Sequence, residues 1–452
     1  MKNHYRLLII LFFATSVACG QNRTIPIFNQ VLFYDGYNTL SNLAGQMVSA
    51  PAGTLRLRTS LFTHKLTQLQ LESFGDYIAM NVTIGAACDN YDRIGNVNLA
   101  FVPKNATTYN PDSVQRIEIG RFITPFMNKN ISPTSVPYTY DVSYLKYIFT
   151  NASLFDVYDV WVELEVFGVP YAANTQVSGC SGRNDVFYGS LEFVTSSPAL
   201  SLADNRMLIP LFMQYYLTNS AGGTDTIGQT VKSSTFSINT PLSDAQLVLI
   251  TSNHGANSGG EEYNRRMHYI FFDGDTVLTY KPGRTTCEPF RVYNTQSNGI
   301  YGTSVRTPAQ WQSFSNWCPG DVIDNRIILF DSLSSGNHTF KITVPSAVFK
   351  NGEGYFPLSL YLLGVSDGIL SNDNQTQIPF EYVQIYPNPV SSRFLINSSK
   401  VVKRVILYHL SGRQVAYSNT NSLDMSGLES GIYGAKIMFE DGSFTVEKII
   451  KD

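Results

Sequence analysis

Residues 158–167 alternate between two kinds of side chain with a period of two. This is the repeat of a β-strand, in which successive side chains point to opposite faces of a sheet. One set is apolar and predicts a buried face, with Tyr158, Val160, Val162, Leu164 and Val166. The other set places carboxylates between aromatic rings, with Asp159, Trp161, Glu163, Glu165 and Phe167. A chain that contains this strand needs a second layer of structure to cover the apolar side of the sheet.

Most of the remaining chain has the same character, and few segments show the period of a helix. Short runs of β-branched and aromatic residues are separated by Gly, Asn, Pro and Ser, a pattern typical of strands joined by turns. Aromatic residues make up 13% of the chain, which favours strands. We therefore predict an all-β protein, with strands that include residues 55–58, 94–102, 114–123, 155–167 and 186–194.

The length of 452 residues predicts several domains rather than one. Two similar blocks, residues 21–197 and 198–366, each have the size of a β-sandwich. Residues 367–380 are polar and are expected to form a linker, and residues 381–452 are expected to form a small third β-sandwich.

The N-terminus has the features of an export signal. Lys2 and Arg6 precede an apolar run, residues 7–18, which is too short to cross a bilayer. We predict that residues 1–20 form a signal peptide. Cys19 follows Ser-Val-Ala, which is similar to an imperfect lipoprotein signal, so the mature chain is either anchored or released.

The cysteines and the net charge limit the classes of ligand. If Cys19 leaves with the signal, an even number remains, which predicts two disulfides with three possible pairings in an exported chain. The close Cys or His spacing of a zinc site is missing from the sequence, so we expect no metal. A net charge of −3 gives no basic surface for phosphates and argues against a nucleic-acid partner. The remaining cysteines are Cys88, Cys180, Cys287 and Cys318.

Two segments concentrate polar chemistry. Residues 88–93 place Asp89, Asp92 and Arg93 directly before the predicted strand 94–102. A carboxylate beside a guanidinium is either a structural ion pair or the centre of a reaction.

The second segment, residues 253–266, contains several glycines and the adjacent Glu261 and Glu262, and it leads into a hairpin with the turn Asp273-Gly274. Glycine permits the backbone shapes of a functional loop, and the alternative is an exposed strand start. The carboxylates of the 158–167 strand have two explanations as well, because their face could grip a sugar between aromatic rings or could simply be solvated.

The last block resembles a known export module. Its turn glycines and apolar runs at residues 385–389, 405–413, 428–433 and 444–450 resemble the type A C-terminal sorting domain of the type IX secretion system of Bacteroidetes-type bacteria. The resemblance implies recognition by that secretion machinery, passage across the outer membrane, and a protein that is secreted or held on the outer cell surface.

Residues 50–366 resemble the peptide-N-glycosidase F family. Five segments, residues 88–93, 118–125, 161–167, 261–263 and 316–320, occur in the order and approximate spacing of that family. The resemblance implies two adjacent eight-stranded jelly rolls with an active site in the groove between them. It also implies an amidase that needs no cofactor and removes N-glycans from glycoproteins or glycopeptides, converting Asn to Asp. We expect a monomer.

The resemblance implies roles for individual residues. Asp92 matches the family's principal catalytic aspartate, Glu262 the glutamate of the second jelly roll, and Glu165 the third acidic residue. Arg93 matches the arginine beside the catalytic aspartate, and Phe167 stands where the best-known member has tryptophan. Further substrate-binding candidates on or near the matching segments are Trp161, Glu261 and His254.

The resemblance also implies a disulfide between Cys287 and Cys318, and by elimination Cys88 then pairs with Cys180. The chain departs from the family where residues 314–316 replace a second-domain arginine. Either Arg306 or Arg266 could supply that charge. A glycan-binding protein without turnover, a structural β-sandwich protein and a glycosidase with two carboxylates are the alternatives to the amidase.

Overall fold

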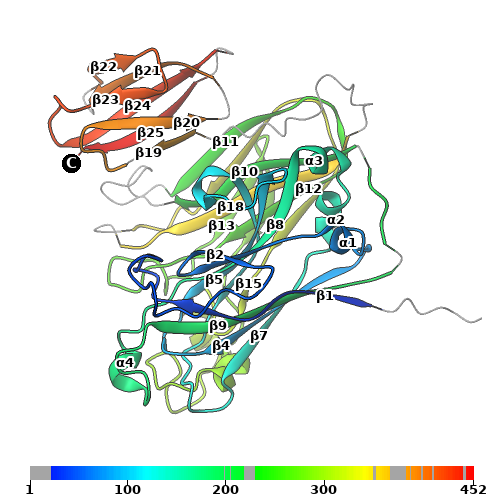
Figure 1. Ribbon diagram of the computed structural model, residues 1–452, viewed down its shortest axis with the longest axis vertical. Coiled ribbons are helices and arrows are strands. Elements are labelled where there is room, and N and C mark those ends of the chain that lie inside the picture. The colour runs from blue at the N-terminus through cyan, green and yellow to red at the C-terminus, as the bar shows by residue number, and fades with distance from the viewer. Residues whose placement is uncertain are drawn as a thin grey trace, which may run out of the picture.

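The computed structural model of the chain describes residues 22–197, 199–203, 205–217, 230–349, 353–366, 383–386, 388–398, 401–409, 412–440 and 444–451. The predicted signal peptide, residues 1–20, and the predicted linker, residues 367–380, lie outside the described residues. Two β-sandwiches lie side by side, and a smaller one lies at one end of the pair (Figure 1). The predicted fold class is confirmed.

The first sandwich packs a four-stranded sheet, in the order β1-β9-β4-β7, on a sheet in the order β15-β6-β5-β8-β3-β2. Its own strands are β1 (Arg23–Tyr34), β2 (Leu55–Arg58), β3 (Leu61–Lys65), β4 (Ile78–Ala86), β5 (Ile94–Pro103), β6 (Gln115–Ile123), β7 (Ser135–Asp141), β8 (Tyr158–Val166) and β9 (Asp185–Thr195). Its connections contain α1 (Gln68–Leu71), η1 (Pro111–Ser113), η2 (Ser143–Leu145), α2 (Lys146–Phe149), α3 (Ala152–Val157) and α4 (Ala173–Gln176).

Strand β8 has the predicted period of two. Val160, Val162 and Leu164 are buried in the core between the two sheets of the first sandwich. On the opposite face Glu165 lies in one row with Asn96 and Arg121 across β5 and β6, and Arg121 contacts the second sandwich. The carboxylate face of β8 therefore belongs to a sheet surface that the second sandwich partly covers.

The beginning of this segment differs from the prediction, because residues 155–157 end a short helix, α3, instead of starting the strand. The Asn151 side chain caps this helix by accepting a hydrogen bond from the N–H of Leu154, at 2.9 Å. A capping asparagine satisfies a backbone donor that has no partner inside the helix, which favours the helical start.

Within its described residues the second sandwich has eight strands, as predicted, in two sheets ordered β10-β18-β12-β16 and β11-β17-β13-β14. Asp273 and Gly274 have positive φ values of 52° and 93° and form the turn of the predicted β13–β14 hairpin. The strands are β10 (Arg206–Leu217), β11 (Val231–Ile238), β12 (Leu242–Thr251), β13 (His268–Phe272), β14 (Asp275–Tyr280), β16 (Arg326–Leu333), β17 (Gly336–Thr343) and β18 (Phe356–Ser366). The connections contain η3 (Glu288–Tyr293) and α5 (Pro308–Gln312).

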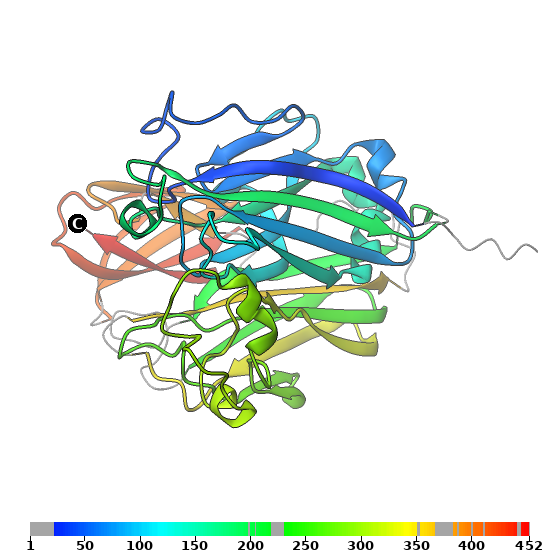
Figure 2. The same ribbon diagram turned by 90° about the horizontal axis from the view of Figure 1, so that it is seen from below.

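The two sandwiches share a sheet. Strand β15 (Val322–Ile323) follows the long connection after β14, but it pairs with β6 of the first sandwich, with Val322 opposite Phe122 and Ile323 opposite Arg121. The first sandwich thus has nine strands of its own, one more than predicted, and gains a tenth from the second. Figure 2 shows the first sandwich, in blue to green, above the second, in green to yellow.

A buried ion pair joins the two sandwiches. Arg121 is fully buried, and its Nε and Nη2 donate hydrogen bonds to the Glu118 carboxylate at 2.8 and 2.6 Å. Its Nη1 donates to Ser252 Oγ at 2.9 Å and to the Pro357 carbonyl at 2.7 Å, both in the second sandwich. The Ser359 hydroxyl donates to Glu118 from the same side. Both charges are therefore satisfied by groups of the two sandwiches together.

The third sandwich, at the C-terminus, packs a sheet ordered β19-β20-β23 against one ordered β22-β21-β24-β25. Its core includes Phe394, Leu407, Ile437 and Ile449. No helix in the described parts of the chain is both long and apolar enough to cross a membrane. The strands are β19 (Val383–Tyr386), β20 (Arg393–Ser398), β21 (Val402–His409), β22 (Gln414–Ser418), β23 (Ser422–Asp424), β24 (Gly431–Phe439) and β25 (Phe444–Lys451).

Replacing Arg121 with Met should lower the free energy of unfolding by about 3–5 kcal/mol, because it leaves the Glu118 charge buried without its partner. The shift of the urea midpoint measures this effect. The double variant Arg121→Met, Glu118→Leu removes both charges and should recover most of the loss. A double variant as unstable as the single one would show that the volume of the arginine, and not its charge, holds the interface.

Candidate active site

The loop at residues 88–93 contains a structural ion pair. Asp89 is buried, and its carboxylate accepts the N–H of Tyr91 at 2.9 Å and the N–H of Val169 at 2.7 Å. Arg93 Nε donates to the same carboxylate at 2.7 Å. The sequence allowed either a structural ion pair or a reaction centre in this loop. Asp89 and Arg93 form the structural ion pair, which leaves Asp92 as the carboxylate available for a reaction.

Both predicted disulfides are formed, Cys88 with Cys180 and Cys287 with Cys318. The first ties the 88–93 loop to the connection that contains α4. The second closes the long connection between β14 and β15. Each disulfide therefore holds a segment that reaches the groove between the sandwiches.

The 253–266 loop fixes Glu262 from two directions. Glu262 Oε2 accepts the N–H of Gly255 at 3.0 Å. Gly255 has a φ of 123°, and a Cβ at this position would lie 2.7 Å from Gly354, so only glycine fits there. Asn316 Nδ2 donates to the carbonyls of Glu261 and Glu262, each at 2.7 Å. The segment that departs from the family pattern thus holds the backbone of the predicted catalytic glutamate.

The two loops bring Asp92 and Glu262 close enough to repel each other electrostatically. Burial, and secondly the negative charge of Glu262, raise the pKa of Asp92 to about 7, while the Arg93 guanidinium opposes the shift. Burial also raises the pKa of Glu262, against the hydrogen bond from Gly255. Both carboxylates therefore bind a proton more tightly than they would in water. One can then act as an acid while the other acts as a base.

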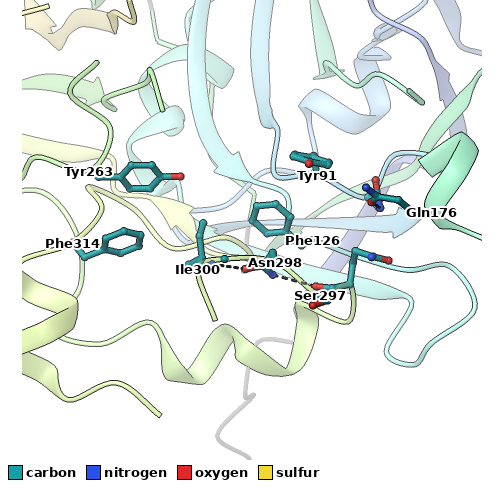
Figure 3. Close-up of a pocket in the computed structure, with 11 residues that line it drawn as sticks. Tyr91, Phe126, Gln176, Tyr263, Ser297, Asn298, Ile300 and Phe314 are labelled. Carbon is teal, nitrogen blue, oxygen red and sulfur yellow. Dashed lines mark hydrogen bonds between the residues drawn. The ribbon is translucent and has the colours of Figure 1, made fainter. Parts of the chain in front are cut away.

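A cavity of about 400 Å³ opens beside this acid pair. The first sandwich contributes Tyr91 and Phe126, and the second contributes Tyr263 and Phe314, whose rings stack at 4.7 Å (Figure 3). Burial and the charges of Glu262 and Asp92 raise the pKa of Tyr263, which places the cavity next to the acids. The remaining lining residues are also uncharged: Asn90, Gln176, Gln296, Ser297, Asn298, Gly299 and Ile300.

Glu165 lies on β8 and faces the second sandwich. Its carboxylate pairs with Arg116 at 3.4 Å and with Arg58 at 3.7 Å, and burial raises its pKa against these cations. Its charge contributes to the raised pKa of Tyr216, whose first cause is burial. The Tyr216 ring lies 4.3 Å from that of Tyr355, and the pKa of Tyr355 is in turn raised by burial and, among smaller effects, by Glu262. Glu165 thus acts electrostatically on Tyr216, and Glu262 acts weakly on the neighbouring Tyr355.

His254 and Glu261 are buried behind the acid pair. His254 Nε2 is hydrogen-bonded to Ser252 Oγ at 2.6 Å, and burial and the charge of Arg121 lower its pKa to about 3, so the ring is neutral. Glu261 pairs with Arg266 at 2.8 Å and accepts the N–H of Val348 at 2.9 Å. Their predicted contact with substrate stays a prediction, and this placement favours a role in positioning the loop.

Trp161 and Phe167 lie at opposite ends of the carboxylate face of β8. Trp161 is 5% exposed, packs beside Tyr109 at 5.5 Å, and precedes Glu165 by about 13 Å along the strand. Phe167 follows the strand and packs edge-on against the exposed ring of Tyr37 at 5.1 Å. Of these two candidates, Phe167 is the one placed near the 88–93 loop, because Val169 binds Asp89.

Comparison with known proteins identifies the family to which the two sandwiches belong. A family model described as peptide-N-glycosidase F, N terminal, matches residues 24–181, and one described as peptide-N-glycosidase F, C terminal, matches residues 224–363. Together the matches span about two thirds of the chain. The chain belongs to the peptide-N-glycosidase F family. A third model, described as a secretion system C-terminal sorting domain, matches residues 384–452, so type IX secretion delivers this N-glycanase family member to the cell surface or the extracellular space.

Solved structures of the family have the same fold. A structure of PNGF-II is 19% identical, covers 77% of this chain and gives a TM-score of 0.55, and the chain spans 66% of the PNGF-II chain. A structure of peptide-N(4)-(N-acetyl-β-D-glucosaminyl)asparagine amidase is 16% identical, covers 78% of this chain and 98% of its own, with a TM-score of 0.50. No curated protein sequence matches the chain.

The sequence-based reasoning missed the residues that line the cavity. Tyr91 and Tyr263 each adjoin a predicted catalytic carboxylate, so their positions were a usable signal. Phe314 stands within the segment that lacks the family arginine, and the Arg306 guanidinium lies over its ring at 4.5 Å. The Arg266 guanidinium forms an ion pair with Glu261. Of the two arginines considered as replacements, Arg306 is the one that reaches a cavity residue.

Replacing Asp92 with Asn should stabilise the protein at alkaline pH. The pKa of Asp92 is about 7 in the folded protein against an ordinary value of 3.8, so the folded state binds this proton more tightly than the unfolded state. Its contribution to stability is therefore lost as the pH rises from about 4 through 7, by up to about 4 kcal/mol. The variant should exceed the wild type in urea midpoint at about pH 8 and by less at about pH 5.

The exposed Asp76, which pairs with Lys146 at 3.8 Å, provides the control. For Asp76→Asn, the difference in urea midpoint from the wild type should be about the same at both pH values. A difference for Asp92→Asn that is the same at both pH values would contradict a buried carboxylate that ionises near 7.

Proposed function

We propose that this chain is an exported amidase that hydrolyses the asparagine side-chain amide linking the polypeptide to the first N-acetylglucosamine of an N-glycan. The observation that carries the proposal is the pair Asp92 and Glu262, one from each sandwich and both with a raised pKa, beside an uncharged, aromatic-lined cavity. Hydrolysis of an amide needs both a base for water and an acid for the leaving nitrogen. Membership of the N-glycanase family supports the choice of this amide as the substrate bond.

In the proposed reaction ionised Asp92 takes a proton from water as the water oxygen bonds to the amide carbon. The C–N bond then breaks, and the leaving nitrogen receives a proton from protonated Glu262. The products are aspartate in the polypeptide and a glycosylamine, which hydrolyses in water to ammonia and the free glycan. The pair keeps one proton in total, because Asp92 holds the proton that water lost.

Arg93 is held by Asp89 and serves as the positive charge beside Asp92. There it can stabilise the oxygen that becomes negative in the tetrahedral intermediate. Glu165 acts as a positioning residue, through Tyr216 and Tyr355, on the Glu262 side of the groove. General acid–base catalysis accounts for roughly 100- to 10,000-fold, so substrate alignment and stabilisation of the oxyanion supply the remainder.

Incubation with a denatured N-glycoprotein tests the proposal. The wild type should release a reducing glycan and leave Asp at the former glycosylation site, as mass analysis of the peptide detects. The rate should fall at both acid and alkaline pH, because the reaction needs one carboxylate of the pair ionised and the other protonated. Asp92→Asn should lose activity by at least about 100-fold, whereas Asp76→Asn should retain it.

Other products identify the alternatives. A peptide that keeps one N-acetylglucosamine would indicate a glycosidase. Retention of glycan without release would indicate a binding protein, an outcome motivated by Phe314 in the place of the family arginine. Full activity of Asp92→Asn would overturn the assignment of the base.

The cavity should be part of the substrate path. Ser297 is exposed at the cavity, so Ser297→Trp fills the space without disturbing a buried core. We expect kcat/KM for a glycopeptide to fall about tenfold or more, since a ligand that loses a well-packed contact loses roughly 1.4 kcal/mol or more. Ser304→Trp places the same ring on an exposed position of the same connection outside the cavity and should have no effect. Equal activity of the two variants would exclude the cavity from the site.

A further inference from the structure

Three aromatic rings of the first sandwich form an exposed cluster near the catalytic loop. Phe167 packs edge-on against Tyr37 at 5.1 Å, and Tyr37 stacks with Tyr171 at 6.4 Å with an angle of 11° between the rings. Tyr37 is 70% exposed and Tyr171 is 62% exposed. We call these residues the aromatic platform. Rings that contact one another and still face water offer a flat apolar surface for a ligand.

The backbone around the platform is fixed by hydrogen bonds. The N–H of Tyr37 is bound by buried Asp35 at 3.1 Å, and the N–H of Gly36 donates to the carbonyl of Gly168 at 2.8 Å. A Cβ on Gly36 would lie 2.5 Å from the Phe167 ring, so glycine lets the two segments approach this closely. The exposed rings are therefore presented by a built turn.

The Tyr171 side of the platform is fixed in the same way. The Pro170 carbonyl accepts hydrogen bonds from both the backbone N–H of Asn174, at 2.9 Å, and its side-chain amide, at 2.8 Å. These bonds close the turn that precedes α4. A ligand that stacks on the platform would therefore lose little affinity to the ordering of the protein backbone.

The platform is continuous with the catalytic loop. Val169, two residues after Phe167, donates its N–H to Asp89 at 2.7 Å, and Asp89 holds Arg93 at 2.7 Å beside Asp92. Asn90 and Tyr91 of this loop line the cavity, and the platform residues are not among its lining. A glycan whose linkage to asparagine lies at Asp92 can thus extend toward the platform.

We propose that the aromatic platform binds sugar residues of the N-glycan that lie beyond its first two N-acetylglucosamine residues. The rings offer flat faces to the C–H groups of a sugar, and the tyrosine hydroxyls offer hydrogen bonds to its hydroxyls. A surface of three side chains is far smaller than a stable protein interface, which favours an oligosaccharide arm over a protein partner. This inference rests on the proposed function, because it assumes that the glycan is linked to the asparagine held at Asp92.

Two glycopeptides with the same peptide test the inference, one with a complete N-glycan and one trimmed to two N-acetylglucosamine residues. The double variant Tyr37→Ala, Tyr171→Ala should lower kcat/KM for the complete glycan by about tenfold, the loss expected for an aromatic stack. The same variant should leave kcat/KM for the trimmed glycan unchanged. Tyr77→Ala, which removes another tyrosine that is 45% exposed on this sandwich, should change neither rate.

Equal losses of kcat/KM on both glycopeptides, or no loss on either, would contradict the proposed sugar binding by the platform. If the wild type releases neither glycan, the proposed function fails, and calorimetric binding of the free oligosaccharide decides the platform separately. Binding that the double variant abolishes would then support the platform, and binding that it leaves intact would overturn it.

Discussion

The site depends on the buried ion pair of Arg121 and Glu118, because this pair sets how the two sandwiches face each other. A buried pair is stable only when hydrogen bonds satisfy both charges. Here Ser252, Pro357 and Ser359 of the second sandwich complete those bonds. Ser252 also binds His254, at the start of the loop that carries Glu262. A displacement of this interface would therefore move Glu262 relative to Asp92.

Asp92 and Glu262 illustrate how a fold can support an unfavourable arrangement. Two carboxylates at close range in a poorly solvated groove oppose folding when both are ionised. The surrounding structure compensates through the Asp89–Arg93 ion pair and through the hydrogen bond from Asn316 to the Glu262 backbone. Carboxylates with shifted pKa values in a groove are typical of catalytic sites. The stability of the rest of the molecule offsets the cost of keeping them close together.

Local patterns in the sequence predicted the parts of the fold that local physics determines. The apolar face of β8 and the Asp273-Gly274 turn follow from side-chain alternation and from backbone preference. Asn151 was a usable signal for the helix that replaces the start of the predicted strand. By contrast, Asn316 acts on a backbone 54 residues away, and β15 is a strand of two residues. The role of Asn316 and the position of β15 cannot be predicted from local sequence patterns, because both depend on contacts between distant parts of the chain. Asp92 and Glu262 were predicted from family resemblance, and their closeness required the structure.

The crossing of β15 into the sheet of the first sandwich limits how this protein can be divided. A gene fragment that ends after the first sandwich leaves β6 as an open edge, with unpaired backbone groups where Val322 and Ile323 belong. A fragment that begins with the second sandwich carries a short strand with no sheet to join. Recombination between relatives should therefore preserve the two sandwiches as one inherited unit.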